Sequence, residues 1–174
     1  MKALLKTPIF TVAEHEALPS GLKPVVVEAP DWVTVVVRSQ GKLLTVKQVR
    51  FGTGKMVEEF VCGQVGPGED PKRAAQRELR EETGYSVELD DIVFLGAASP
   101  NPAFMDNTMR WYLVDLDQAP AYDVLGLDPD EDEQLEINWV DAAEFTERTF
   151  KAALAGGNDV PAMLLAALAL AARS

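Results

Sequence analysis

Cysteine and histidine are nearly absent from this chain of 174 residues, which contains one of each. The single cysteine, Cys62, excludes a framework of internal disulfides and is typical of a reducing compartment. We interpret its thiol as a small buried apolar group, because sulfur is a poor ligand for hard cations. The single histidine, His15, lies in a polar N-terminal segment. A histidine-dependent catalytic triad or zinc site is therefore not expected.

Basic residues are scarce relative to acidic ones. The chain has 16 Lys and Arg residues against 28 Asp and Glu residues, which gives a formal net charge of −12 at pH 7. This balance argues against binding of long nucleic acids, whose phosphates attract basic surfaces. It does not argue against a small anionic substrate, because a bound divalent cation reverses the local field.

Long apolar runs are missing as well. The N-terminal segment MKALLKTPIF has no apolar stretch followed by a cleavage motif, and the Ala- and Leu-rich segment Pro161–Ala172 is too short to span a bilayer. No internal repeat or low-complexity linker divides the chain. We therefore expect a single domain over residues 1–174, in a cytoplasmic protein that does not associate with membranes.

The sequence does contain one helix with well-marked ends. Asp70 is a good N-cap residue, and Pro71 suits the first helical position because no hydrogen bond of its nitrogen is needed there. Gly84 provides a C-terminal stop. The residues between them favour helix, so the pattern predicts a helix over Pro71–Thr83.

Three carboxylates gather on this predicted helix. Glu78 and Glu82 lie one turn apart on the same face, with Glu81 beside them. Like charges at this spacing repel by a few tenths of a kcal/mol, so the arrangement calls for a cation. The preceding loop, residues 63–68, contains three glycines and a proline, which let backbone groups approach a ligand closely. Loop and helix together predict a site for a hard cation and a phosphate.

The spacing of these residues resembles the Nudix box of the Nudix hydrolases. The matching positions are Gly63, Glu69, Arg77-Glu78-Leu79, Glu81-Glu82 and Gly84. Tyr85 departs slightly, because the family usually has an aliphatic residue there. The resemblance implies an α/β fold, a Nudix-type α/β/α sandwich around a mixed central sheet. It also implies Mg²⁺-dependent hydrolysis of a nucleoside diphosphate linked to another moiety.

Segments flanking the box are similar to the ADP-ribose pyrophosphatase branch of this family. They are LLTVKQVRF at residues 43–51, Glu59, the GPGEDP turn, Ser99-Pro100 and the acidic run before residues 137–140. Val61 stands where that branch commonly has proline, and residues 101–107 replace a shorter glycine-rich segment. The resemblance implies hydrolysis of ADP-ribose to AMP and ribose 5-phosphate. A GDP-sugar, NADH or a dinucleotide remains an alternative substrate.

The metal ligands follow from the box. We expect Glu78 and Glu82 to be the main side-chain ligands of Mg²⁺, with Mn²⁺ as a substitute and Glu81 close enough to bind a second ion. By resemblance, the backbone carbonyl of Cys62 is a further ligand. Gly63, Glu69, Arg77 and Gly84 are expected to have structural roles in the box. Arg77 in particular is expected to orient Glu81 or Glu69, and Glu69 either caps the helix or supports the loop.

The general base is expected from an acidic segment. In the ADP-ribose branch the base usually comes from an acidic loop before a late strand, and residues 128–134 lie at that place. Glu133 is the first candidate and Glu131 the second, with Glu81 as a third. The alternative interpretation of this segment is a solvated run of charges.

Four residues are candidates for substrate binding: Arg50, Glu59, Gln64 and Phe104. The segment equivalent to that of Arg50 often reaches the phosphates or the terminal ribose in this family, but a surface salt bridge is an equal alternative. Phe104 is a candidate for flanking an adenine, although apolar residues after a strand belong more often to the core.

The remaining pattern predicts strands around the box and helices at the end. Expected strands are residues 7–13, 22–28, 32–38, 43–49, 56–61, 87–97, 108–116 and 135–140, and expected helices are residues 142–155 and 161–172. Strands within residues 1–30 and the apolar last helix suggest a homodimer.

Two other classes of function occur among proteins with this fold. Some proteins with this fold isomerise isopentenyl diphosphate, but they use a reactive cysteine and no second cysteine is available here. A nucleotide-sugar sensor without catalysis is the other alternative. Such sensors often lose box carboxylates, whereas this chain retains all of them.

Overall fold

The computed structural model describes residues 1–118, 123–124, 135–156 and 160–173. A central sheet of seven strands organises the molecule. The strands are β4 (Trp32–Ser39), β5 (Lys42–Arg50), β6 (Lys55–Glu59), β7 (Val61–Gln64), β9 (Ile92–Ala98), β10 (Met109–Asp115) and β12 (Glu136–Asp141). Their main order is β12-β5-β4-β10-β9, with β6 paired to β5 and β7 paired to β4. Because β10 runs parallel to β4 while the other pairs are antiparallel, the sheet is mixed, as expected.

A tight turn joins β4 and β5 at the expected place. Gln40 and Gly41 have φ angles of 49° and 74°, the left-handed conformation that two-residue hairpin turns need. The β-branched residues that predict both strands are buried in the centre of the sheet, including Val33, Val35 and Val46.

The segment before the box is divided between two strands. Residues 56–61 were expected to form one strand, but the chain breaks at Phe60. Before this residue β6 pairs with β5, and after it β7 pairs with β4. The change of partner carries the chain across the sheet and brings Gly63 to the start of the box loop.

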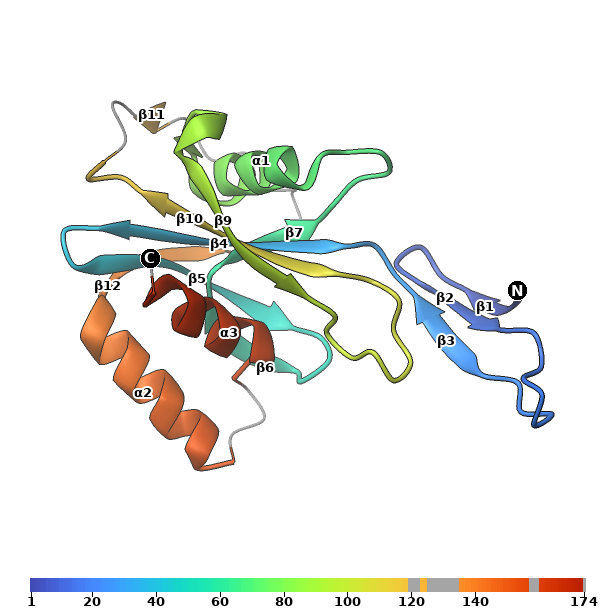
Figure 1. Cartoon of the computed structure of the whole chain (residues 1–174). Helices are drawn as coiled ribbons and strands as arrows, with labels where there is room; N and C mark the ends of the chain where they lie inside the picture. Colours follow the sequence, from blue (N-terminus) through green and yellow to red (C-terminus); the bar gives the residue numbers. More distant parts are fainter. Residues whose placement is uncertain (119–122, 125–134, 157–159, 174) are drawn as a thin grey trace.

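Helices cover both faces of the sheet (Figure 1). Helix α1 (Pro71–Thr83) lies on one face, whereas α2 (Ala142–Leu154) and α3 (Ala162–Ala171) lie on the other. Each face has its own core. Leu79 of α1 packs in the first cluster, and Phe145 of α2 and Leu168 of α3 pack in the second. The protein is thus the α/β/α sandwich that the box resemblance implies.

The N-terminal strands form a separate small sheet that projects from the sandwich (Figure 1). Its strands are β1 (Lys2–Lys6), β2 (Thr11–Glu14) and β3 (Val25–Glu28), in this order. Strand β1 was not expected, and residues 7–10 form a turn in which the Thr7 hydroxyl donates to the Phe10 carbonyl at 2.8 Å. The sheet meets the body where the Val27 amide donates to the Phe104 carbonyl at 2.7 Å.

Short elements complete the fold. They are β8 (Tyr85–Ser86), the 3₁₀ turn η1 (Leu89–Asp91) and β11 (Asp123–Val124), which pairs with β8. Within the described ranges, we find no helix whose length and apolar character would let it cross a membrane.

Candidate active site

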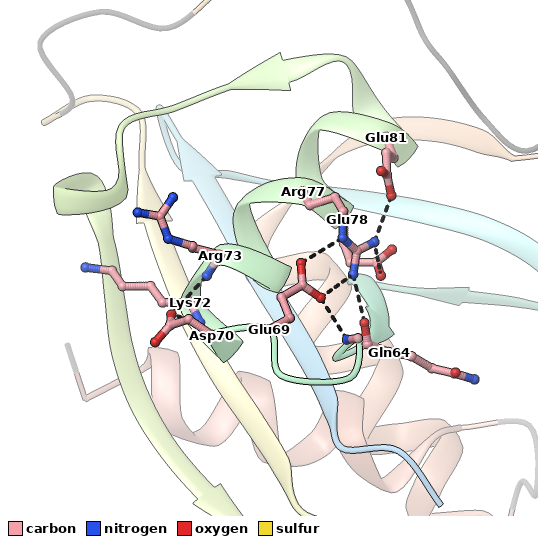
Figure 2. Close-up of polar contacts among 9 residues, drawn as sticks. Gln64, Glu69, Asp70, Lys72, Arg73, Arg77, Glu78 and Glu81 are labelled. Atoms are coloured by element: carbon pink, nitrogen blue, oxygen red, sulfur yellow. Dashed lines mark hydrogen bonds and ion pairs between the residues drawn. The ribbon is translucent and has the colours of Figure 1, made fainter. Parts of the chain in front are cut away.

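Helix α1 has the bounds that its capping residues predict. The Asp70 carboxylate accepts hydrogen bonds from the backbone amides of Lys72 and Arg73 at 2.9 and 3.2 Å. Gly84 ends the helix with φ 76°, and its amide donates to the Arg80 carbonyl. The small or apolar side chains that face the sheet are buried: Ala74, Ala75 and Leu79. This packing leaves the carboxylate-bearing face directed toward the box loop (Figure 2).

Arg77 is the centre of the polar contacts on this helix (Figure 2). Its guanidinium bonds both carboxylate oxygens of Glu69 at 3.0 Å. The same group donates to Glu78 at 2.7 Å and to Glu81 at 2.9 Å. It also donates to the backbone carbonyl of Gln64 at 2.9 Å. These contacts, of which the one to Glu69 is the strongest, raise the pKa of Arg77 above its ordinary value. The side chain therefore ties the loop to the helix.

Glu69 holds the glycine-rich loop in place. Its Oε2 accepts a hydrogen bond from the Gly66 amide at 2.8 Å in addition to the contacts with Arg77. The hydrogen bond with Arg77 is the main cause that lowers the pKa of Glu69, and the Gly66 amide contributes in the same direction. The geometry is that of a loop support rather than a helix cap, since Asp70 occupies the cap position.

Glu78 packs directly on the backbone of Gly63. A Cβ atom built at Gly63 would lie 1.9 Å from the Glu78 carboxyl carbon, so a side chain there would collide with this carboxylate. The Cys62 carbonyl belongs to the peptide unit that joins Cys62 to Gly63, the residue whose backbone this carboxylate approaches. A carboxylate and a backbone carbonyl are oxygen donors of the kind that Mg²⁺ prefers, and Mg²⁺ needs only a few protein ligands because it keeps several waters. The donors present thus fit a hard divalent cation.

The end of the helix reaches a buried group of charged residues. Glu82, in the last turn of α1, is 6% exposed. Nearby, Arg50 forms an ion pair with Glu59 at 2.6 Å and donates to the Cys62 sulfur at 2.9 Å. Glu59 is 3% exposed, and this burial raises its pKa although Arg50 opposes the shift. Burial likewise raises the pKa of the Cys62 thiol well above its ordinary value, which disfavours the thiolate form.

The remaining candidates lie in different places. In Figure 2 the Gln64 side chain points away from Arg77, so only its backbone carbonyl takes part in the contacts described above. Phe104 is 45% exposed in the loop between β9 and β10, beside the N-terminal sheet. Glu131 and Glu133 lie outside the described residues. In the part of the chain that the structure describes, no three His, Cys, Asp or Glu side chains form a metal-binding cluster by themselves.

The sequence suggested a salt bridge as one interpretation of Arg50 but did not identify its partners, Glu59 and Cys62. Strand register places Glu59 opposite Val46 rather than opposite Arg50. The ion pair therefore joins two residues that the strand register does not place opposite each other, and the contact with Cys62 follows the change of strand partner at Phe60. The thiol is buried as expected but also accepts a hydrogen bond from an arginine.

A glycine-rich loop and a carboxylate-bearing helix lie together on one face of an α/β/α sandwich. This arrangement is typical of hydrolases that act on diphosphates, and comparison with known proteins identifies the family. The model of the NUDIX domain matches residues 28–157. An ADP-ribose pyrophosphatase of Bacillus subtilis (strain 168) is 31% identical over 156 residues, which cover 84% of this chain and 83% of the relative. The chain belongs to the NUDIX family, and the expected enzyme class, a Nudix pyrophosphohydrolase, is confirmed.

Other relatives share shorter segments or the fold. The ADP compounds hydrolase NudE of Escherichia coli (strain K12) is 32% identical over 98 residues, which cover 56% of this chain and 49% of the relative. A crystal structure of an ADP compounds hydrolase superposes with a TM-score of 0.77 and 23% identity, covering 99% of this chain and 89% of that chain. This likeness confirms the fold. Nudix hydrolases generally use divalent metal ions.

Proposed function

We propose that this protein hydrolyses ADP-ribose to AMP and ribose 5-phosphate in the presence of Mg²⁺. The observation that carries the proposal is the close approach of the Glu78 carboxylate, on helix α1, to the backbone of Gly63, at the start of the glycine-rich loop. The substrate class is supported by the relative named ADP-ribose pyrophosphatase, which shares most of its length with this chain.

In this proposal Glu78, Glu82 and the Cys62 carbonyl hold the first metal ion, and Glu81 contributes to a second. Mn²⁺ would substitute because it accepts the same oxygen donors. When bound, a divalent ion neutralises the phosphate oxygens and lowers the pKa of an attacking water. Arg77 orients Glu78 and Glu81, to which it donates hydrogen bonds at 2.7 and 2.9 Å.

The other residues of the chain have proposed roles in binding and proton transfer. Arg50 contributes a partly buried positive charge for the phosphates or terminal ribose, and Phe104 offers an exposed aromatic face for a base. Glu133, or alternatively Glu131, accepts the proton of the water. Hydrolysis of a diphosphate needs only such positioning and charge neutralisation, without covalent participation of the protein.

A substrate panel tests the proposal. ADP-ribose, a GDP-sugar, NADH and a dinucleotide would be incubated with the protein, with and without Mg²⁺, while AMP and phosphorylated sugars are detected. We expect ADP-ribose to have the highest kcat/KM and the activity to require the metal. Preference for another compound would replace the substrate and keep the reaction. Tight binding without turnover of any compound would favour a nucleotide-sugar sensor.

We further infer that residues 1–174 form one domain that assembles as a homodimer through the N-terminal strands. The projecting sheet exposes several large apolar side chains, among them Leu4, Leu5, Ile9 and Phe10, more than an isolated surface normally presents together. Light scattering should give about twice the chain mass of 19.0 kDa. A mass of one chain at micromolar concentration would reject the dimer.

A further inference from the structure

Two ion pairs bridge the neighbouring parallel strands β4 and β10, one at each end of their pairing. Arg110 donates to Asp31, the residue just before β4, at 2.6 Å. Arg38 donates to Asp115 at 2.8 Å at the other end of the same two strands. All four side chains are partly buried, so the two pairs are matched in length and in environment. Each pair is therefore a control for the loss of the other.

Asp31 connects the box loop to the beginning of β10. Its Oδ1 accepts a hydrogen bond from the Thr108 amide at 2.7 Å, and its Oδ2 accepts the bond from Arg110. Its backbone carbonyl accepts a hydrogen bond from the amide of Val65, in the box loop, at 2.8 Å. This last contact extends the pairing of β7 with β4 by one residue. The carboxylate thus fixes, on β10, the same residue whose carbonyl holds the loop.

Asp115 has an equivalent set of carboxylate contacts but in a different place. Its Oδ1 accepts a hydrogen bond from the Asp117 amide at 3.2 Å, and its Oδ2 accepts the bond from Arg38. Each of the two aspartates therefore binds one backbone amide and one arginine through its carboxylate. In the part of the chain that the structure describes, the hydrogen bonds of the Asp115 side chain all stay at the far end of β10.

The box loop is held by two different elements. On the helix, Arg77 donates to the backbone carbonyl of Gln64 at 2.9 Å (Figure 2). The next residue, Val65, is held by the carbonyl of Asp31, in the segment before β4. Consecutive peptide groups of the loop are thus fixed by helix α1 and by the central sheet.

Arg77 carries the position of the loop to the box carboxylates. The guanidinium that binds the Gln64 carbonyl also donates to Glu78 at 2.7 Å and to Glu81 at 2.9 Å. A displaced loop would move the Gln64 carbonyl, and the arginine and its two carboxylates would follow. Displacements of about 1 Å are enough to impair a site whose groups must be held in place.

We propose that Asp31 is a positioning residue for the metal site, which fixes the box loop and, through the loop and Arg77, the carboxylates of Glu78 and Glu81. The inference rests on the metal site of the proposed function. Asp31 acts through Val65 and is not a ligand itself. Loss of its carboxylate removes the contacts that hold this residue on β10, so its carbonyl would no longer be fixed toward the loop.

Calorimetric titration of the full chain with Mn²⁺ alone tests the inference without any need for turnover. We expect Asp31→Ala to raise the Kd at least about fivefold, somewhat less than the 10- to 100-fold typical of direct partners of metal ligands. Asp115→Ala, the matched control, should stay within about twofold of the wild type. Asp31→Asn should lie between Asp31→Ala and the wild type, because its amide oxygen can still accept from Thr108.

Thermal melts show whether the two alanine variants are equally destabilised. Their melting temperatures should agree within about 3 °C, which corresponds to a small difference in stability for a chain of this size. Under that condition, a weaker Kd in Asp31→Ala alone cannot result from general destabilisation. If Asp31→Ala does not fold, the comparison of Asp31→Asn with Asp115→Asn decides the question in the same way.

Amide hydrogen exchange gives a second readout on the metal-free protein. The Val65 amide should exchange at least about tenfold faster in Asp31→Ala than in Asp115→Ala, because the loop is released locally. The amide of Val35, in the buried centre of β4, should exchange equally in both variants. Unchanged exchange at Val65 would overturn the inference. So would an unchanged Kd for Asp31→Ala, or an equal loss of Mn²⁺ affinity in Asp115→Ala.

The outcomes separate this inference from the proposed substrate. If the wild type binds Mn²⁺ but does not hydrolyse ADP-ribose, the substrate assignment fails and the role of Asp31 is still decided by the titrations. If the wild type takes up no Mn²⁺ at all, both the metal site and the role of Asp31 are rejected.

Discussion

The two faces of the central sheet are covered by helices of contrasting chemistry. Helix α1 buries small and apolar side chains together with Glu82 and Thr83 of its last turn, and its other side carries Arg77, Glu78 and Glu81. Helix α3, on the opposite face, consists only of alanine, leucine and methionine over Ala162–Ala171. The first face arranges charges around a loop, while the second supplies apolar area. This contrast suggests that activity and stability can be altered separately.

The largest expected effect is on the apolar face. Leu168→Ala removes a buried side chain from the cluster around Phe145 and should lower the free energy of unfolding by about 2–5 kcal/mol. Urea unfolding measures this loss. At a temperature where the variant is folded, kcat should stay within about twofold of the wild type, because the site lies across the sheet. A much larger fall in kcat would show that the two faces are coupled.

On the charged face, the expected effect is on catalysis. Glu82→Gln should reduce kcat at least about 10²-fold if the carboxylate holds the metal, a barrier change of about 2.7 kcal/mol. The free energy of unfolding should not decrease by a similar amount, because the substitution also relieves repulsion between like charges on the helix. Steady-state kinetics at saturating Mg²⁺ and urea unfolding give both quantities. Wild-type turnover in this variant would remove Glu82 from the mechanism.

Helix caps on the two faces allow a closer comparison. Asp70 caps α1, and Asp141 caps α2 by accepting a hydrogen bond from the Glu144 amide at 2.9 Å. Each change to alanine should cost about 1 kcal/mol of stability. Only Asp70→Ala should also reduce activity, because the cap adjoins the box loop. Equal activity in the two variants would show that the loop tolerates fraying of its helix.

The smallest expected effect concerns acid stability. Folding lowers the pKa of Glu69 below its ordinary value of 4.5. The ion pair of Glu69 therefore stabilises the folded protein at pH values above 4.5, and this stabilisation is lost as the pH falls through the lower pKa of the folded state. As the pH falls below about 5, the wild type should lose about 0.2–1 kcal/mol more stability than Glu69→Gln. Parallel thermal melts across this range check the difference. Identical pH slopes would contradict it.

The sequence predicted what depends on local interactions. Helix α1 was assigned its bounds because the cap, the first-turn proline and the terminal glycine are all local signals. Strands β4 and β5 were also predicted, because their β-branched residues favour strands locally. Strand β1 was missed because Lys-Ala-Leu-Leu-Lys has no strand preference of its own, and it is extended only through pairing with β2.

Contacts between distant segments were beyond local reasoning. The break at Phe60 depends on two strands competing for one segment, which composition does not reveal. The same is true of the ion pair between Arg50 and Glu59. The box carboxylates were found because helical spacing determines which side chains are neighbours. The candidate bases Glu131 and Glu133 stay predictions from resemblance.

The outermost strand of the N-terminal sheet begins with Lys2 and ends with Lys6. An unpaired edge strand can pair with strands of other chains, and lysines on such an edge commonly disfavour this pairing. Association through this sheet is therefore expected to use the face of the sheet and not its edge strand. Contact between two such faces forms a closed dimer, whereas repeated pairing of edge strands would continue into filaments.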